Sequence, residues 1–175
     1  MRQRSAYAGP VTEPSPTPTA PEDDALALER QVCFALSVAA RNVVAVYRQV
    51  LDPLGLTHPQ YLVMLALWQH GQLSVKDLTR LLQLDAGTVS PLLKRLEARG
   101  LLRRERDPRD QRNLALSLTP AGRRLRAEAE RIPAGIVERL GMPVEELLSL
   151  HEALSKVISA SHQALAAESA ASTVA

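Results

Sequence analysis

Residues 74–96 read SVKDLTRLLQLDAGTVSPLLKRL, and the kind of fold can be predicted from this segment. It holds two signals for the start of a helix. Ser74 with Asp77 three residues later is a variant of the capping box, and Asp85 is a good N-cap for a second helical run. Gly100 suits the position that follows the end of this second helix. Two short helices joined by a brief turn predict a helix-turn-helix.

The flanking segments extend this unit into a winged helix. Residues 58–70 are apolar almost all round, which predicts a buried helix in front of the pair, with Pro59 in its first turn. Residues 101–106 and 114–118 are short strand candidates, the second because leucines alternate with small residues. The charged residues 107–112 between them predict the tip of a hairpin, which is the wing.

Further helices are expected on both sides of the winged helix. A stripe of apolar side chains three and four residues apart predicts a first helix over about residues 24–51. A long helix is expected over about residues 120–140, with Pro133 and Gly135 as the place for a bend. A last helix is expected over about residues 144–161. The fold class is therefore mainly α.

Composition excludes several classes of protein. The chain has 175 residues and one cysteine, which rules out an intrachain disulfide framework and a cysteine-built zinc site. The four histidines are scattered, so we expect neither a metal site nor a cofactor. No apolar run reaches about 18 residues and no secretory signal is visible, so we expect a cytoplasmic protein without a membrane partner.

Positive charge gathers on the helix-turn-helix and its wing. Residues 94–112 hold eight basic and four acidic side chains, a net charge of +4. Because the whole chain carries +2, the remainder carries −2. A solvated charged face explains most charge runs, but here the run coincides with a helix-turn-helix and a hairpin tip. Neutralising phosphates releases counterions, so this placement predicts binding to double-stranded DNA.

The N-terminal half of the second short helix is expected to enter the major groove. Thr88 and Ser90 are small polar side chains that can approach base edges, Val89 is placed to touch a thymine methyl group, and Gly87 permits close backbone approach. Pro91 removes one backbone donor, so the helix either begins near this residue or tolerates a distortion.

Charged residues further along are expected to bind the DNA backbone and the minor groove. Lys94 and Arg95 are expected to hold phosphates. At the wing tip, Arg109 or Arg112 is expected to reach a narrow minor groove, and Asp110 to aim an arginine through a charge-assisted hydrogen bond. The predicted DNA-binding residues are Asp85, Ala86, Gly87, Thr88, Ser90, Lys94, Arg95, Arg109, Asp110 and Arg112.

Several motifs carry a family resemblance over about residues 25–160. DQR at 110–112, followed after five residues by Leu118-Thr119, resembles the wing signature of MarR-type winged-helix repressors. Three further stretches resemble the OhrR subgroup, the repressors that sense organic hydroperoxides. They are QVCFAL at 31–36, LTHPQYLV at 56–63 and LDAGTVSPLLKRL at 84–96.

The resemblance implies a homodimer formed by the first helix and the two C-terminal helices. It also implies a pseudo-palindromic operator and repression of a peroxidase gene, released when the cysteine of the first helix is oxidised. The expected segments are a disordered Pro-rich tail (1–24), a dimerisation helix and linker (25–58), the winged helix-turn-helix domain (59–119), C-terminal dimerisation helices (120–162) and a frayed Ala/Ser tail (163–175).

Cys33 is the candidate redox sensor. Tyr47 lies fourteen residues further along, about 21 Å in a straight helix, so the two cannot touch within one chain. In the resembling proteins the cysteine of one subunit faces this tyrosine of the other, and a phenol that donates to sulfur favours the thiolate. Tyr61 and His58 are further sensor candidates, although His58 stands where many subgroup members have tyrosine. Another departure is Ser37, where some members have tyrosine.

Some members resolve the oxidised cysteine with a second one, which this chain lacks. Oxidation is therefore expected to end in a mixed disulfide with a low-molecular-weight thiol, or in overoxidation.

Other readings stay open. Cys33 is a small core residue in the simplest reading, His58 a helix-capping residue and Tyr47 an ordinary interface aromatic. A MarR-type repressor released by a phenolic or other small ligand would leave Cys33 purely structural. An enzyme, such as a thiol peroxidase, is disfavoured because no resolving cysteine, Cys-x-x-Cys or metal-binding spacing is present. The last alternative is a helical interaction protein that binds no DNA.

Overall fold

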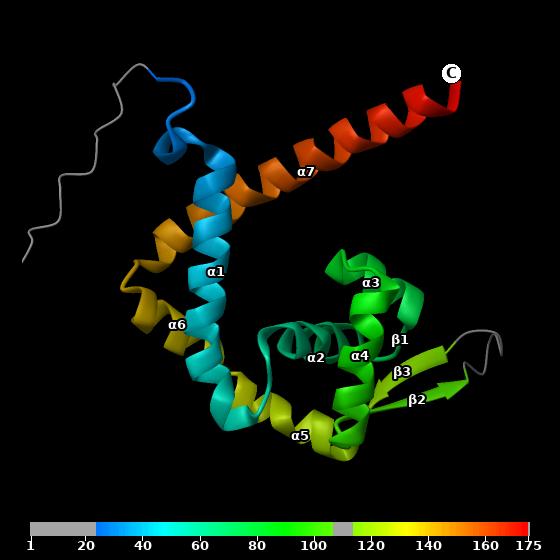
Figure 1. Cartoon of the computed structure of the whole chain (residues 1–175). Coiled ribbons are helices and arrows are strands. Elements are labelled where there is room, and N and C mark those ends of the chain that lie inside the picture. Colours follow the sequence, from blue (N-terminus) through cyan, green and yellow to red (C-terminus); the bar gives the residue numbers. More distant parts are fainter. Residues whose placement is uncertain (1–23, 107–113, 175) are drawn as a thin grey trace, which may run out of the picture. The chain divides into compact units, whose positions relative to one another are not determined.

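The computed structural model describes residues 24–106 and 114–174 (Figure 1). The chain divides into two compact units, the first ending at Ala40 and the second beginning at Arg41. No helix in the described ranges is long and apolar enough to cross a membrane. The predicted Pro-rich tail, up to residue 23, and the tip of the wing, residues 107–113, lie outside the described residues.

The first unit holds a short 3-10 helix, Leu28–Arg30, and the beginning of α1 (Val32–Leu51), which ends in the second unit. The predicted start near residue 24 is wrong, because Gln31 has an extended backbone between the two helices. The side-chain amide of Gln31 donates to the carbonyl oxygen of Ala25 at 2.7 Å. This hydrogen bond stabilises the turn before α1 as a separate element. The predicted end at Leu51 is confirmed, and a 3-10 turn, Asp52–Leu54, follows it.

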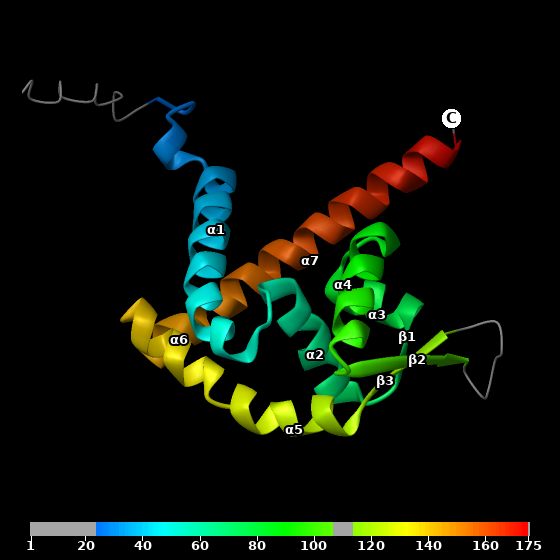
Figure 2. The ribbon, with the colours of Figure 1, turned by 60° about the horizontal axis from the view of Figure 1, so that its bottom comes forward.

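The second unit contains the predicted winged helix. Its helices are α2 (His58–His70), α3 (Val75–Leu82) and α4 (Ala86–Ala98), and its hairpin strands are β2 (Leu102–Arg106) and β3 (Leu114–Leu118). A short strand that was not predicted, β1 (Leu73–Ser74), pairs with β3, giving an antiparallel sheet in the order β1-β3-β2. Two residues cannot show the alternation that identifies a strand in sequence. Figure 2 shows β2 and β3 leaving the base of α4 side by side.

Local capping signals explain why these helices begin where they do. Thr57 and Gln60 form a capping box at α2, with the backbone N–H of Thr57 donating to Gln60 Oε1 at 2.9 Å. The hydroxyl of Ser74 accepts from the backbone N–H of Asp77 at 3.0 Å and caps α3. Gly100 has a φ of 67°, in the left-handed region expected of a residue after a helix end. These predicted boundaries are confirmed.

The core of the second unit lies between α2, α4 and the sheet. Side chains that are completely or almost completely buried come from α2, α3, α4, β2 and β3 and from α1 and α6, and include Leu51, Met64, Leu67, Leu78, Leu93, Leu96, Leu102, Leu116 and Ile132. On β3 the predicted inward set is only partly right. Leu116 is buried, whereas Leu114 is 45% exposed and Ala115 is buried in its place.

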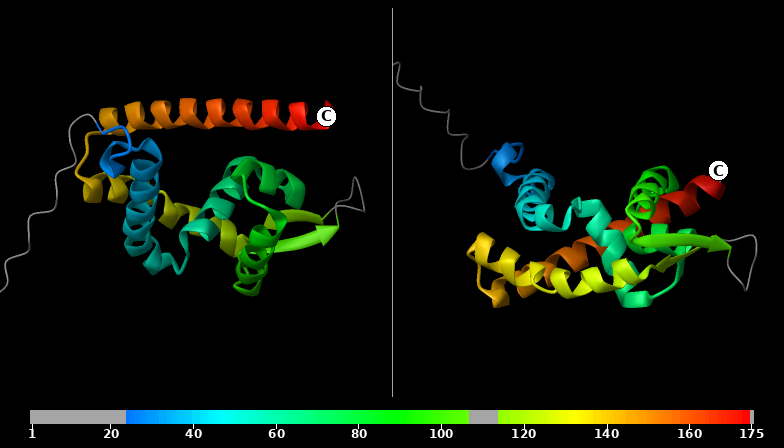
Figure 3. Two further views of the ribbon diagram at one scale, coloured as in Figure 1. Left: turned by 45° about the horizontal axis from the view of Figure 1, so that its top comes forward. Right: turned by 90° about the horizontal axis from the view of Figure 1, so that it is seen from below.

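The C-terminal part differs from prediction in two ways. The single helix expected over residues 120–140 is two helices, α5 (Pro120–Ala129) and α6 (Ile132–Leu140), separated by a break that Figure 2 shows. Pro133 has no N–H to donate to Ala129, so the α5 hydrogen-bond ladder cannot continue through it. The last helix, α7 (Val144–Val174), runs on through the segment expected to fray, as Figure 3 shows. Alanine has the highest helix propensity, which favours this continuation.

Gly122 in the first turn of α5 allows a close approach to the backbone of Leu101 at the base of the wing. A Cβ at this position would overlap the carbonyl oxygen of Leu101, lie 2.9 Å from its carbonyl carbon and 3.2 Å from Leu118 Cδ2. Two of these atoms belong to the backbone, so the contact cannot be relieved by a side-chain rotation.

We expect Gly122→Ala to lower the free energy of unfolding by about 1–3 kcal/mol, the usual cost of forcing an extra carbon into a packed site. Denaturant unfolding followed by circular dichroism measures this change. Gly135→Ala in α6 is the matched control, because its Cβ would meet Val50 at an ordinary 3.5 Å. The free energy of unfolding of that variant should stay the same or rise by up to about 1 kcal/mol. Equal stability of both variants would contradict the close approach at Gly122.

Candidate functional site

The N-terminus of α4 is built around Asp85. Its carboxylate accepts from the backbone N–H of Thr88 at 2.8 Å and from the Thr88 hydroxyl at 2.6 Å. The hydroxyl and amide of Thr88 hold the pKa of Asp85 below its ordinary value, so the carboxylate stays ionised near neutral pH. Because the Thr88 hydroxyl donates to Asp85, its oxygen remains available as an acceptor. The predicted N-cap is confirmed, and Asp85 orients Thr88.

The exposed face of α4 carries most of the side chains predicted to contact DNA. Ala86, Gly87, Thr88, Ser90, Lys94 and Arg95 are all exposed. Val89 is 0% exposed and belongs to the core, so its predicted contact with a thymine methyl group is wrong. The helix is continuous from Ala86 through Pro91, which settles the alternative left open by the sequence. Pro91 leaves the carbonyl of Gly87 without its helical donor.

The basic residues of the region divide into two groups. Arg99 donates to the carbonyl oxygens of Leu54, at 2.9 Å, and Gly55, so it ties α4 to the turn before α2. Arg104 binds Glu97, with Nε donating to Oε2 at 2.8 Å, and joins β2 to α4. These two arginines therefore serve the fold, and Arg103 joins them because its Nε donates to the Ser117 hydroxyl of β3 at 3.0 Å.

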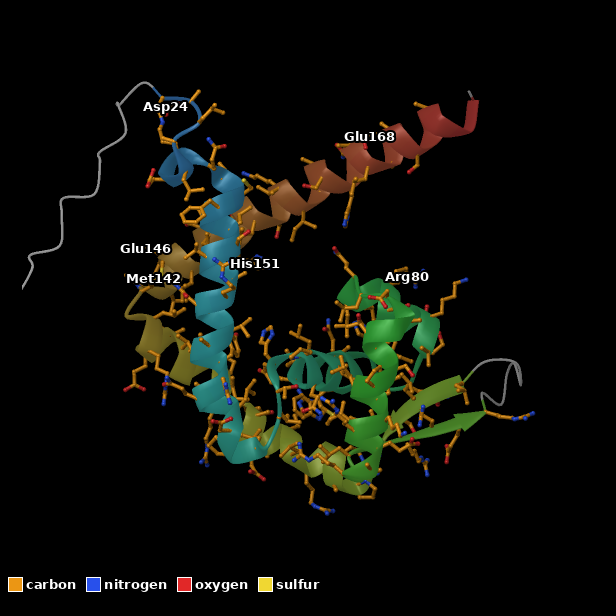
Figure 4. The ribbon with its side chains drawn as sticks, in the orientation of Figure 1. Asp24, Arg80, Met142, Glu146, His151 and Glu168 are labelled. Carbon is orange, nitrogen blue, oxygen red and sulfur yellow. The ribbon has the colours of Figure 1, made fainter. Side chains whose placement is uncertain are left out.

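The second group is exposed. Lys94 and Arg95 make no ion pair or side-chain hydrogen bond within the described ranges, and Arg106 at the end of β2 is exposed too. On α3, Arg80, which is labelled in Figure 4, is ion-paired with Asp77 at 2.9 Å. Arg109, Asp110 and Arg112 lie outside the described residues. The positive charge of the surface therefore rests on fewer residues than the sequence count suggests.

Three of the four predicted sensor residues form an aromatic cluster in the second unit. The ring of Tyr47 from α1 lies 5.0 Å from that of His58 and 6.1 Å from that of Tyr61, both on α2. Burial raises the pKa of Tyr47, burial and the neighbouring Tyr47 raise the pKa of Tyr61, and burial lowers the pKa of His58. At neutral pH the phenols therefore keep their protons, and His58 is neutral.

The cluster continues into a residue that the sequence analysis did not single out. The ring of Trp68 lies 6.4 Å from that of Tyr61, and its Nε1 donates to the carbonyl oxygen of Gly122 at 2.9 Å. A pocket of about 460 Å³ borders these two rings. Its lining comes from α2, α5, α6 and the residue after α5, namely Tyr61, Leu65, Trp68, Gln69, Arg126, Ala129, Glu130 and Pro133. The seven-residue spacing of Tyr61 and Trp68 on one buried helix was the available signal.

Cys33 belongs to the first unit, whereas the aromatic cluster belongs to the second. It is exposed near the start of α1, and its carbonyl accepts from the Ser37 hydroxyl at 2.8 Å. The structure therefore does not bear out the simplest reading of Cys33 as a core residue. Among the described residues no group of three or more histidine, cysteine or acidic side chains is placed to hold a metal ion.

The chain is similar to proteins of one known family. A family model described as the MarR family matches residues 56–114. Over 140 residues the chain is 40% identical to the organic hydroperoxide resistance transcriptional regulator of Bacillus subtilis (strain 168), covering 80% of this chain and 95% of that protein. The chain belongs to the MarR family. Because its fold and its relatives are those of transcriptional regulators, it is a DNA-binding regulator and not an enzyme.

Solved structures of other MarR regulators share the fold. Reduced AbfR bound to DNA matches with a TM-score of 0.62 and 32% identity, covering 75% of this chain and 92% of that one. Overoxidised AbfR bound to DNA and a disulfide form of AbfR match with TM-scores of 0.60 and 0.56. The repressor CouR bound to a 23-mer DNA duplex matches with a TM-score of 0.69 and 27% identity, covering 74% of this chain and 94% of that one.

In this MarR regulator the Glu97–Arg104 ion pair holds the wing to α4. Both side chains are about one-third exposed, and hydrogen bonds from Arg104 hold the pKa of Glu97 below its ordinary value of 4.5. A carboxyl group whose pKa is lowered by folding stabilises the folded state above its unfolded pKa. This stabilisation is lost as the pH falls through the folded pKa.

Glu97→Gln is therefore expected to lower the free energy of unfolding at pH 7 by about 1 kcal/mol. The difference from wild type should shrink as the pH falls below 4.5, the ordinary pKa of the group. Thermal unfolding across this pH range measures it. Glu105→Gln is the control, because the Arg103–Glu105 pair is more than half exposed and should contribute less. A Glu97→Gln difference that does not depend on pH would contradict the assignment.

Proposed function

We propose that this MarR regulator is a homodimeric repressor that senses organic hydroperoxides through Cys33 and then releases its operator. The observation that carries the proposal is the 40% identity with an organic hydroperoxide resistance regulator, in a chain whose lone cysteine is exposed. The AbfR structures support it, because a similar fold has been solved in reduced, overoxidised and disulfide forms. No observation favours the alternative of a phenolic effector to the same degree.

The DNA-binding step uses the exposed face of α4. Thr88 and Ser90 approach base edges in the major groove, with Thr88 offering an acceptor because its proton is engaged by Asp85. Lys94 and Arg95 lie about one helical turn further on and bind phosphates. The wing residues Arg109 or Arg112 reach the minor groove, as the sequence predicts, with Asp110 aiming them.

Homodimerisation is supported by apolar side chains that the chain itself leaves exposed. They lie on α1 and α7 and include Val32, Phe34, Val44, Val144, Leu148, Leu150, Val157, Ile158 and Leu165. A second copy that covers these faces would bury them, which is favourable by about 25 cal/mol per Å² of apolar surface. The two DNA-binding domains of a dimer, held at a fixed spacing, match the two half-sites of a pseudo-palindromic operator.

The sensing chemistry starts at the thiolate of Cys33. It attacks the outer oxygen of an organic hydroperoxide, an S–O bond forms, the O–O bond breaks, and the alkoxide leaves as an alcohol after taking a proton. The resulting sulfenic acid condenses with a low-molecular-weight thiol, forming a mixed disulfide and releasing water. In the dimer, Cys33 of one subunit lies near Tyr47 of the other, so the adduct displaces this ring. The distance between the two DNA-binding domains then changes, and the dimer leaves the DNA.

Replacing either phosphate-binding residue should weaken binding on all DNA sequences. We expect Lys94→Ala and Arg95→Ala each to reduce the slope of log affinity against log salt by about two, because the dimer loses one phosphate contact in each subunit. Titration of a DNA duplex selected by the reduced protein, at several salt concentrations, measures this slope. Arg124→Ala on α5 removes the same charge from an exposed position outside α4 and serves as the control. An equal change in the control would mean that net charge, and not α4, determines binding.

Cys33→Ser should bind this duplex with wild-type affinity and should not release it when cumene hydroperoxide is added. The serine hydroxyl is a poor nucleophile toward the O–O bond, so the variant should not be oxidised at this position. Serine is similar to cysteine in size and the position is exposed, so the fold should not change. Binding assays and mass spectrometry of the same samples make the measurement. Release of Cys33→Ser by hydroperoxide would contradict the sensor role. Release of wild type by phenolic compounds alone would point to the ligand-controlled alternative.

A further inference from the structure

A line of packed rings connects α1 with the first turn of α5. Tyr47 and Tyr61 lie 6.1 Å apart between ring centres, and Tyr61 and Trp68 lie 6.4 Å apart. The line ends on a directed contact, because Trp68 Nε1 donates to the carbonyl oxygen of Gly122 at 2.9 Å. Tyr61 is buried and Trp68 is half-buried, so a displaced Tyr47 ring pushes on protein rather than on solvent.

The far end of this line is the junction that holds the DNA-reading elements together. The backbone N–H of Gly122 donates to the hydroxyl of Thr119 at 3.1 Å. That hydroxyl donates to the carbonyl oxygen of Gly100, at 2.6 Å, just beyond the end of α4. The backbone N–H of Thr119 donates to Leu101 at 3.1 Å, at the start of the wing. A shift of Gly122 therefore moves α4 and both wing strands at their common base.

The two rings nearest this junction have room to move. The pocket of about 460 Å³ lies beside Tyr61 and Trp68, with Leu65 on the same helix and Arg126, Ala129 and Pro133 on its α5 and α6 side. Packed interiors resist deformation, and a side chain changes position easily only where a void adjoins it. The rings can thus shift toward the pocket without expanding the core.

We propose that Trp68 is a positioning residue that couples the aromatic cluster to the base of the wing and the end of α4. A displacement of Tyr47 reaches the DNA-reading elements through Tyr61, Trp68 and Gly122. The inference rests on the proposed function for its input, which is oxidation at Cys33. It assigns to Trp68 the transmission of that input, separate from any direct contact with DNA or hydroperoxide.

The chain contains one tryptophan, so fluorescence excited at a wavelength where tyrosine does not absorb reports on Trp68 alone. We expect cumene hydroperoxide to change the emission maximum and the iodide quenching of the wild-type protein, and to leave both unchanged in Cys33→Ser. A purely structural tryptophan would not respond to oxidation of a residue in the other unit. The coupling is overturned if wild-type protein leaves its DNA duplex while the Trp68 emission and quenching stay constant.

Trp68→Phe keeps an aromatic ring but removes the donor to Gly122. We expect the reduced variant to bind the selected duplex within about threefold of wild type, while the loss of affinity caused by hydroperoxide becomes about tenfold smaller than in wild type. Leu65→Ala is the matched control, because Leu65 lines the same pocket but has no side-chain donor for Gly122, so the variant should respond like wild type. Thermal unfolding of each variant verifies that it is folded.

The outcomes separate the two hypotheses. If wild type and Trp68→Phe are released equally, the coupling is wrong and the proposed sensor function stands. If Leu65→Ala loses the response as strongly as Trp68→Phe, the pocket as a whole and not the Trp68 contact transmits the signal, and the coupling is wrong again. If hydroperoxide does not release wild-type protein from DNA, the sensor function fails and the coupling fails with it.

Discussion

The close approach of Gly122 to the backbone of Leu101 is the constraint on which the DNA-binding part of the molecule depends. The end of α4, the start of β2, the end of β3 and the start of α5 all meet there. Thr119 closes the junction by capping α5 and by donating to Gly100 from its hydroxyl. Only a residue without a Cβ fits between these backbones without displacing them. The direction of the wing relative to α4 follows from this contact.

The basic residues are divided between contacts within the fold and contacts proposed for DNA. Eight basic residues in a run of nineteen suggest a broad phosphate-binding surface, yet Arg99 and Arg104 are engaged in the fold. Arg99 satisfies two carbonyl groups at the turn before α2, and Arg104 binds a carboxylate of α4. An arginine presents several donors in a fixed plane, so it serves such joints well. The exposed Lys94 and Arg95 then carry the phosphate contacts that the proposed function needs.

The aromatic residues of α1 and α2 form one cluster of rings in contact. Tyr47 is separated from His58 by a helix end and a turn, yet their rings are in edge contact, and Tyr61 and Trp68 continue the contact along α2. The low aromatic content of the chain makes this concentration unusual, with three tyrosines and one tryptophan in the whole sequence. Burial keeps the phenols protonated and His58 neutral, so the cluster near neutral pH is uncharged.

The local sequence was enough to predict the helix starts at residues 58, 75, 86 and 120, because capping residues and prolines act within one turn of their own position. It also predicted the hairpin, whose strands flank a charged turn. The folded chain alone shows that Val89 is buried, that Arg99 and Arg104 are structural, and that β1 joins the sheet. It likewise decided that Trp68 reaches Gly122. Each of these depends on partners distant in sequence, whose positions no local pattern contains.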